Sequence, residues 1–154
     1  MEQGELDLWR MVDVGWYNSC LSIFNLDLDS IREKVQKGET DVQGLRDSIK
    51  DYYVKISARF EGMNLELLDD GFPVDVLGEL RGNVIPTMGK RYDELDALLT
   101  QYASGSAAVE ESIISKISEC LSLVARMDTL GNEFEQNKGY REYRKTNPDR
   151  IYLE

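Results

Sequence analysis

The sequence predicts an all-α fold: an elongated, mostly antiparallel bundle of three long helices and a shorter N-terminal helix, with coiled-coil character. Three observations predict this fold. Apolar residues recur every three to four, or every seven, positions through most of the 154-residue chain, which is the period of a helix surface. Only 3 prolines are present to interrupt the helices. Charged residues make up 31% of the chain, which is typical of long helices with solvated faces.

The first segment, residues 6–26, is predicted to be the shorter helix, because its apolar residues follow steps of three and four. Both tryptophans, Trp9 and Trp16, fall on one face of this helix, and Tyr17 lies beside them. Gly15 weakens the helix by about 1 kcal/mol relative to alanine. Two interpretations are open. The aromatic stripe either seals the first helix onto the bundle or partly docks a helix of a partner protein.

The second segment has the clearest seven-residue repeat, which indicates a long helix with a narrow apolar seam. We predict one continuous helix from about residue 28 to a stop at residues 69–73, because the repeat passes unshifted through residues 37–41, where Gly38 offers a possible break. Gly71 and Pro73 then mark the end of this helix and the start of the next. The first position of the repeat holds Leu28, Val35, Val42, Ile49, Ile56 and Met63.

The third segment carries a second heptad frame that contains a proline. Pro86 removes a backbone hydrogen bond, so the helix either bends there or is replaced by two helices, the second starting near Pro86. Gly78 and Gly82 are spaced so that another backbone could approach closely, or they mark a helix end. The frame consists of Val74, Leu77, Val84, Met88, Leu95, Leu98 and Tyr102.

The fourth segment follows a turn at residues 103–106, and we predict a helix that reaches about Gln136. Its stripe includes Ile113, Ile117, Cys120, Val124, Met127 and Phe134. Beyond Gly139 the chain shows no apolar period. We therefore divide the chain into a helical bundle domain, residues 1–137, and a basic, tyrosine-rich, extended C-terminal tail, residues 138–154.

The tail differs in charge from the rest of the chain. It carries five basic and three acidic side chains, whereas residues 1–137 carry 13 basic and 26 acidic ones. Interleaved basic and aromatic residues bind RNA, single strands or acidic protein surfaces, although the tail could equally be unstructured or fold back on its own bundle. The residues that we predict to bind a partner are Trp9, Trp16, Tyr17, Tyr140, Arg141, Tyr143 and Arg144.

The residues that are missing exclude several kinds of catalytic chemistry. The sequence has no histidine, so Ser–His–Asp and Cys–His nucleophiles, His-ligated zinc and His-ligated haem cannot be built. Cys20 and Cys120 cannot supply a four-thiolate metal site. Acidic pairs such as Asp69–Asp70 fall at helix ends or on wet faces. We predict that the protein is not an enzyme and has no catalytic residues, metal or cofactor.

The composition also predicts where the protein works. No run of about 18 apolar residues is present, so we expect no membrane insertion. The acidic N-terminus is unlike a signal peptide, and two cysteines give no disulfide framework, which favours an intracellular, cytoplasmic or nuclear location. A bundle with this much negative charge repels phosphate backbones, so we expect no direct nucleic-acid binding by the bundle.

The function that we expect is a non-enzymatic interaction or scaffold subunit of a multiprotein complex. It would bind other helical proteins, in a hetero-complex or a homo-oligomer, through its heptad seams. One alternative is an acidic inhibitor or mimic that occupies a basic site on a regulatory or nucleic-acid-handling partner. The other is a small-molecule-binding or enzymatic helical bundle, which requires an apolar cavity with a converging pair of carboxylates.

Overall fold

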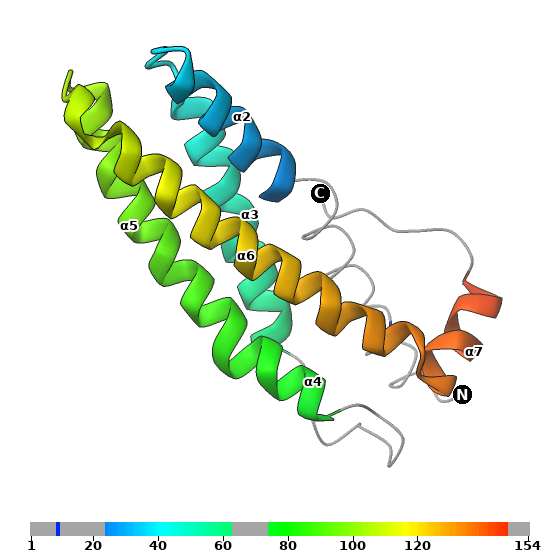
Figure 1. Cartoon of the computed structure of the whole chain (residues 1–154). Helices are drawn as coiled ribbons and strands as arrows, with labels where there is room; N and C mark the ends of the chain where they lie inside the picture. Colours follow the sequence, from blue (N-terminus) through cyan, green and yellow to red (C-terminus); the bar gives the residue numbers. More distant parts are fainter. Residues whose placement is uncertain (1–8, 10–23, 63–73, 148–154) are drawn as a thin grey trace.

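The computed structural model describes Trp9 and residues 24–62 and 74–147, and all structural statements concern these residues. They form helices without any strand, which confirms the predicted all-α bundle. Figure 1 shows α2, α3, α5 and α6 as an elongated bundle, with α7 lying across one end. The elements are α2 (Phe24–Gln36), α3 (Gln43–Glu61), α4 (Val74–Glu79), the π-helical turn η3 (Leu80–Val84), α5 (Ile85–Ala103), the short 3-10 turn η4 (Ala107–Val109), α6 (Glu110–Glu135) and α7 (Lys138–Thr146).

Residues 28–62 form a helical hairpin, in which α2 and α3 are joined by a turn. The prediction of one continuous helix through this stretch was therefore wrong. Gly38 has a φ of 76°, a conformation that glycine adopts without strain. Its amide donates to the carbonyl of Val35 at 3.0 Å, and the amide of Glu39 donates to the carbonyl of Lys34 at 2.9 Å, which closes α2 with a Schellman motif. The repeat passed through the turn because the apolar positions on both sides of it, including Val35 and Val42, are buried in the same core.

Side-chain contacts show how two pairs of helices are aligned, whereas an antiparallel arrangement of the whole bundle stays a prediction. Between α3 and the helical segment 74–103, Arg46 contacts Asp96 of α5 and Glu61 contacts Arg81 of η3, so residue numbers rise along one helix as they fall along the other. The pairs that the same segment forms with α6, Glu94–Lys116 and Glu79–Arg126, show the same reversal. The coiled-coil character stays a prediction.

Pro86 does not break the third helix. Residues 74–103 are helical throughout, with one π-helical turn immediately before the proline, where the amide of Ile85 bonds to the carbonyl of Leu80. This wider turn accommodates the proline ring, which in a regular helix meets the carbonyl four residues back. A Cβ atom at Gly78 or Gly82 would meet nothing within 4 Å, so neither glycine makes a close helix contact. Val74, which was assigned to the apolar frame, is exposed.

Residues 138–146 form helix α7, so the prediction of an extended tail was wrong for this stretch. The side chain of Asn137 caps the helix by accepting a hydrogen bond from the amide of Gly139 at 2.9 Å. Tyr140 and Tyr143 are both 3% exposed and belong to the core. An apolar face of two tyrosines three residues apart is too short to show a period. Residues 148–154 lie outside the described residues.

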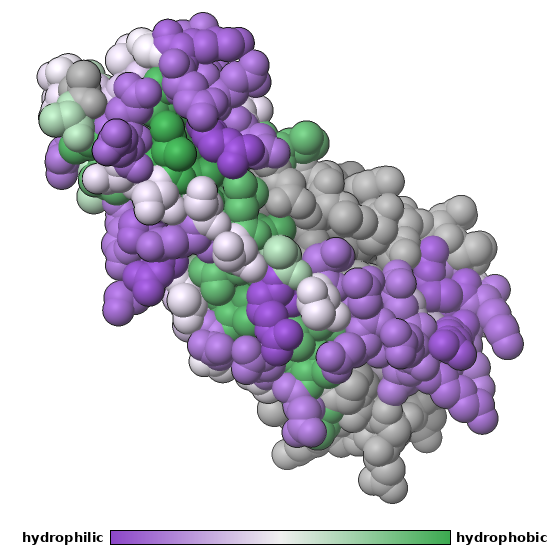
Figure 2. Space-filling view, viewed as in Figure 1, coloured by the Kyte–Doolittle hydropathy of each residue, from purple (hydrophilic) through white to green (hydrophobic). Residues whose placement is uncertain are grey.

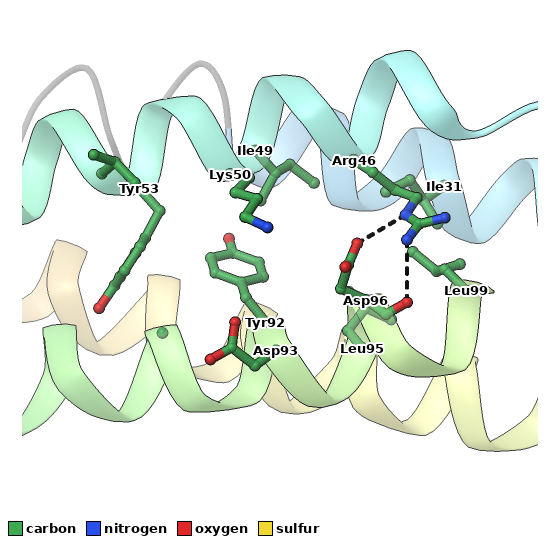
Figure 3. A pocket seen from close by; sticks show the side chains of 12 residues that line it. Ile31, Arg46, Ile49, Lys50, Tyr53, Tyr92, Asp93, Leu95, Asp96 and Leu99 are labelled. Carbon is green, nitrogen blue, oxygen red and sulfur yellow. Dashed lines mark hydrogen bonds and ion pairs between the residues drawn. The ribbon is translucent and has the colours of Figure 1, made fainter. Parts of the chain in front are cut away.

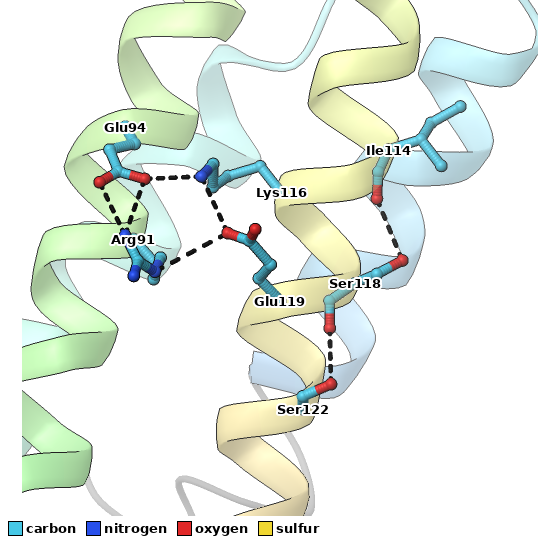
Figure 4. A network of polar contacts seen from close by, with 7 residues as sticks. All are labelled: Arg91, Glu94, Ile114, Lys116, Ser118, Glu119 and Ser122. Atoms are coloured by element: carbon cyan, nitrogen blue, oxygen red, sulfur yellow. Dashed lines mark hydrogen bonds and ion pairs between the residues drawn. The ribbon is translucent and has the colours of Figure 1, made fainter.

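A network of four charged side chains joins α5 to α6 (Figure 4). Lys116 donates to Glu94 at 2.6 Å and to Glu119 at 2.8 Å, and Arg91 donates to Glu94 at 2.8 Å. The hydrogen bond from Lys116 is the main cause that lowers the pKa of Glu94. Figure 2 shows that hydrophilic side chains cover most of the face in view, with a narrow hydrophobic band along the bundle.

Candidate functional site

A groove with a volume of about 180 Å³ lies between α3 and α5, and Ile31 of α2 lines its buried side (Figure 3). Each wall is one face of a helix, because the lining residues are spaced at intervals of three and four along α3 and at helical intervals along α5. The wall from α3 consists of Arg46, Ile49, Lys50, Tyr53 and Val54. The wall from α5 consists of Gly89, Tyr92, Asp93, Leu95, Asp96 and Leu99.

At one end of the groove, the Tyr53 side chain extends from α3 toward α5 (Figure 3), and its ring lies over Gly89. The hydroxyl of Tyr53 donates a hydrogen bond to the carbonyl of Ile85 at 2.9 Å. A Cβ atom at Gly89 would lie 2.6 Å from Cζ of Tyr53, so this position has to be glycine for the ring to lie where it does. Burial of the phenol raises the pKa of Tyr53. The tyrosine and the glycine thus form a fixed link between the two helices.

At the other end, Arg46 links α3 to α5 through three hydrogen bonds. Its Nε donates to Oδ1 of Asp96 at 2.8 Å, and its Nη2 donates to Oγ1 of Thr100 at 2.8 Å and to the backbone oxygen of Asp96 at 3.3 Å. The Arg46 side chain is only 12% exposed, whereas the side chain of Asp96 is 43% exposed, so this charge-assisted contact is partly buried. Arg46 and Tyr53 are seven residues apart, which places the two links about 10 Å apart along α3.

Between these links, the groove is apolar inside and charged at its rim. Ile49, Leu95 and Leu99 are buried, whereas Val54 is 60% exposed at the mouth. Lys50 and Asp93 are exposed on opposite walls, and neither forms an ion pair with any residue of the described ranges. The groove therefore combines an accessible apolar surface with one positive and one negative group that have no ionic partner in the described chain.

Two aromatic rings line the groove side by side, Tyr53 at its end and Tyr92 toward its middle. Tyr53 and Tyr92 meet edge to face, with ring centroids 6.0 Å apart. Figure 3 shows the Lys50 side chain extending from α3 toward the hydroxyl of Tyr92. Burial is the main cause that raises the pKa of Tyr92 well above its ordinary value. These rings offer rigid apolar surface to whatever occupies the groove.

The two carboxylates that line the groove differ in their contacts. Asp93 and Asp96 both line it, but Asp96 is engaged by Arg46, so the two carboxylates do not form a free acid–base pair. In the part of the chain that the structure describes, no group of three or more metal-ligating side chains is gathered at one place. The Cys120 thiol is buried, which raises its pKa to about 12 and makes it a poor nucleophile at neutral pH.

Trp9, which we predicted to bind a partner, lies in the core of the chain itself. Its ring is 2% exposed and meets Phe134 edge to face at 6.4 Å and Tyr140 at 5.7 Å. A Cβ atom at Gly139 would lie 3.0 Å from the Trp9 ring, so α7 and Trp9 are closely fitted. Tyr140 and Tyr143 are buried in the same aromatic cluster. The structure therefore gives these three aromatic residues an internal packing contact, and their partner-binding role stays a prediction.

The other predicted partner-binding residues are placed differently. Arg141 is exposed on α7, and its Nε donates to the backbone oxygen of Glu135 at 3.3 Å. Arg144 is partly buried and donates to the backbone oxygen of Asn147 at 2.9 Å. Trp16 and Tyr17 lie outside the described residues. The structure thus brings Trp9, Tyr140 and Tyr143 together and leaves Arg141 facing solvent.

The sequence reasoning missed the groove. Ile49 and Leu95 belong to the predicted apolar frames, and Gly89 indicates only a weak stretch of helix at residues 78–89. The pattern predicts no role for Tyr53 or Lys50. One available signal was Val54, an apolar residue outside the heptad seam. A second was Gly89, a glycine in the middle of a long helix, where it costs stability unless close packing requires it.

Comparison with known proteins gives no assignment, since no protein-family model, curated protein or solved structure matches the chain. None of the described helices has the length and the apolar run that a membrane crossing requires. The function therefore has to be argued from the geometry of the groove.

Proposed function

We propose that this protein is a non-enzymatic interaction subunit of a multiprotein complex, and that it binds an amphipathic helix of a partner protein in the α3–α5 groove. The observation that carries this proposal is an apolar groove between two linked helices. Val54 is exposed at the mouth of the groove, and the charged side chains of Lys50 and Asp93 lie at its rim. Recognition of an amphipathic helix by a hydrophobic groove needs this combination of surfaces.

The size of the groove fits one anchoring side chain of a partner helix. An apolar cavity of about 150 Å³ holds one benzene molecule, so a groove of about 180 Å³ accepts one aromatic or large aliphatic side chain. The two links stand about 10 Å apart, which is the length of two helical turns. A partner helix would thus place one anchor between them, with its neighbouring turns resting on the rim.

The charges at the rim support a particular orientation of that helix. Lys50 stands on the α3 wall and Asp93 on the α5 wall. A partner with an acidic residue on the side of Lys50 and a basic residue on the side of Asp93 would complement both groups. Such rim pairs contribute mainly to specificity and to the association rate, whereas the buried anchor supplies most of the affinity.

The rigidity of the walls also supports binding. Arg46 and Tyr53 tie α3 to α5 at both ends of the groove, and both are held by hydrogen bonds. A groove that is already formed requires little ordering when the partner arrives, which leaves more of the contact energy as affinity.

Two substitutions at matched exposed sites test the proposal. Val54→Glu places a charge at the mouth of the groove, whereas Leu26→Glu does the same on α2, where the side chain is equally exposed (61% against 60%). Tagged wild-type and variant chains are expressed in the native source, and co-purified proteins are quantified by mass spectrometry. We expect a partner that is retained by Leu26→Glu and reduced at least tenfold by Val54→Glu. Equal recovery with all three chains would refute the proposal.

The Tyr53–Tyr92 ring pair favours a second candidate, a small aromatic ligand in the same groove. Adding indole to the purified chain tests it. Saturable binding of indole that is lost in a Leu95→Trp variant, whose larger side chain fills the groove, would favour this second function.

A further inference from the structure

Helix α7 presents a basic face that is separate from the α3–α5 groove. Lys138, Arg141 and Lys145 follow positions i, i+3 and i+7, so they share one side of the helix, and all three are exposed. Glu142 is exposed beside Lys138 and Lys145, so this side carries three cations and one carboxylate, a net charge of +2. Tyr140 and Tyr143 on the opposite side are buried in the bundle. Figure 1 shows α7 lying across the end of the long helices, where its outer face is at the end of the molecule.

The helix dipole accounts for only part of this positive charge. A positive charge in the last turn is favoured by the helix dipole, which explains Lys145, but the dipole disfavours Lys138 at the first position. Neither lysine forms an ion pair with any residue of the described ranges. Arg141 uses only its Nε, in a long contact with a backbone oxygen, and its two Nη groups make no hydrogen bond to described residues.

The basic face is held in a fixed orientation. Asn137 caps the first turn of α7, and Trp9 packs against Tyr140 and Gly139 on the inner side. The three cations therefore project from a rigid helix and not from a flexible tail. A partner that binds them has only side-chain freedom to restrict, which lowers the entropic cost of association.

The remaining charge of the chain selects the kind of partner. Residues 1–137 carry 26 acidic against 13 basic side chains, so a long polyanion such as nucleic acid or an anionic membrane is repelled by most of the molecule. A short acidic segment avoids this repulsion. Lys138, Arg141 and Lys145 lie at about 0, 4.5 and 10.5 Å along the helix axis, because each residue rises by about 1.5 Å. Carboxylates at positions i, i+3 and i+7 of a second helix have the same spacing.

We infer that the outer face of α7 binds an acidic helix of a partner protein, with carboxylates at i, i+3 and i+7 opposite Lys138, Arg141 and Lys145. This contact is independent of the groove, since no residue of α7 lines it. The two surfaces would let one chain engage two helical segments.

Two designed peptides serve as probes of this contact with the full chain. Both are 21-residue alanine-based helices of the same composition, one with three glutamates at i, i+3 and i+7 and one with the glutamates distributed around the helix. Fluorescence anisotropy measures their affinity at 50 mM and 300 mM salt. We expect the matched peptide to bind at least tenfold more tightly than the distributed one at 50 mM salt, and to weaken at the higher salt concentration.

A matched pair of triple variants assigns the binding to α7. The test variant is Lys138→Gln, Arg141→Gln and Lys145→Gln. The control is Lys34→Gln, Lys37→Gln and Lys55→Gln, which removes the same charge from three lysines that already pair with carboxylates. Circular dichroism verifies that both fold. The test variant should lose the tenfold preference for the matched peptide, whereas the control should stay within twofold of wild type.

Several results would overturn the inference. These are equal affinity for the two peptides, an equal loss in both triple variants, or tighter α7-dependent binding of a 12-nucleotide oligouridylate or of phosphatidylserine vesicles. Self-association that the test variant abolishes would assign the face to a second copy of the chain. If the triple variant does not fold, Lys145→Glu replaces it. Its binding should then be restored by a peptide with lysine at the facing position, and failure of that restoration would also contradict the inference.

Discussion

A substitution of Gly89 by alanine should destabilise the protein only because Tyr53 lies above it. In an open helix, alanine is more favourable than glycine by about 1 kcal/mol. Here the new methyl carbon would lie 2.6 Å from Cζ of Tyr53, far inside the usual contact distance of about 3.5–4.0 Å. The ring must move, which breaks its hydrogen bond to the carbonyl of Ile85 and strains a half-buried side chain.

The magnitudes give the sign of the effect. The lost hydrogen bond costs about 1 kcal/mol and the strained rotamer costs about 1 kcal/mol. These two costs together are about 2 kcal/mol, and the gain in helix propensity offsets about 1 kcal/mol of them. Gly89→Ala should therefore lower the free energy of unfolding by about 1 kcal/mol. In a Tyr53→Ala background the obstacle is gone, and the same substitution should raise this free energy by about 1 kcal/mol. The coupling energy between the two positions is therefore about 2 kcal/mol.

Urea unfolding followed by circular dichroism at 222 nm measures this cycle. Gly78→Ala is the control, because a Cβ atom at Gly78 meets nothing within 4 Å. Gly78→Ala should stabilise the wild-type chain and the Tyr53→Ala chain equally, so the coupling energy between positions 78 and 53 should be near zero. A coupling below about 0.5 kcal/mol between Gly89 and Tyr53 would refute the description of the groove, since it would mean that the ring does not lie over the glycine.

Three further predictions concern the core and the charge network. Trp9→Ala should reduce the free energy of unfolding by about 3–5 kcal/mol, because it removes a ring that is 2% exposed; a change below about 1 kcal/mol in urea unfolding would contradict this packing. Lys116 holds the pKa of Glu94 below its ordinary value in the folded chain. The contribution of ionised Glu94 to folding stability is therefore present above the unfolded-state pKa and is lost as the pH falls through the lower folded-state pKa. The melting temperature of Glu94→Gln should thus fall less than that of wild type between about pH 5 and pH 3, and parallel profiles would disprove the role of this pair. In a Cys20→Ser variant, the buried Cys120 thiol, with its pKa raised to about 12, should react with a thiol reagent at pH 8 only as fast as the chain unfolds, and rapid labelling of the folded chain would contradict its burial.

The apolar period predicted which residues enter the core, and the small residues at 103–106 predicted the turn before α6, but the turn after α2 was missed. Leu28, Val35, Val42, Ile49 and Ile56 are all buried, as their seven-residue spacing indicated. The same spacing could not distinguish a long helix from a hairpin, because the two helices bury equivalent positions in one core. The turn was marked only by Gly38, and a single glycine within a helical pattern is a weak signal.

The groove could not be predicted because it depends on how two distant helices align. Tyr53 fits over Gly89 only in the observed pairing of α3 with α5, and nothing local to either position specifies that pairing. Arg46 reaches Asp96 for the same reason. Helix α7 escaped prediction on other grounds, since its stability comes from packing against Trp9, a residue more than 130 positions earlier in the sequence.

Site-specific photo-crosslinking from the mouth of the groove tests the central claim most directly. A benzophenone amino acid at position 54 would lie at the groove, whereas the same amino acid at position 26 would lie on an equally exposed helical surface elsewhere. After irradiation in the native source, mass spectrometry identifies the attached peptides. The groove proposal predicts adducts at position 54 alone, within an amphipathic helix that carries a large apolar residue flanked by an acidic and a basic residue. Adducts of equal yield at both positions, or none at position 54, would contradict it.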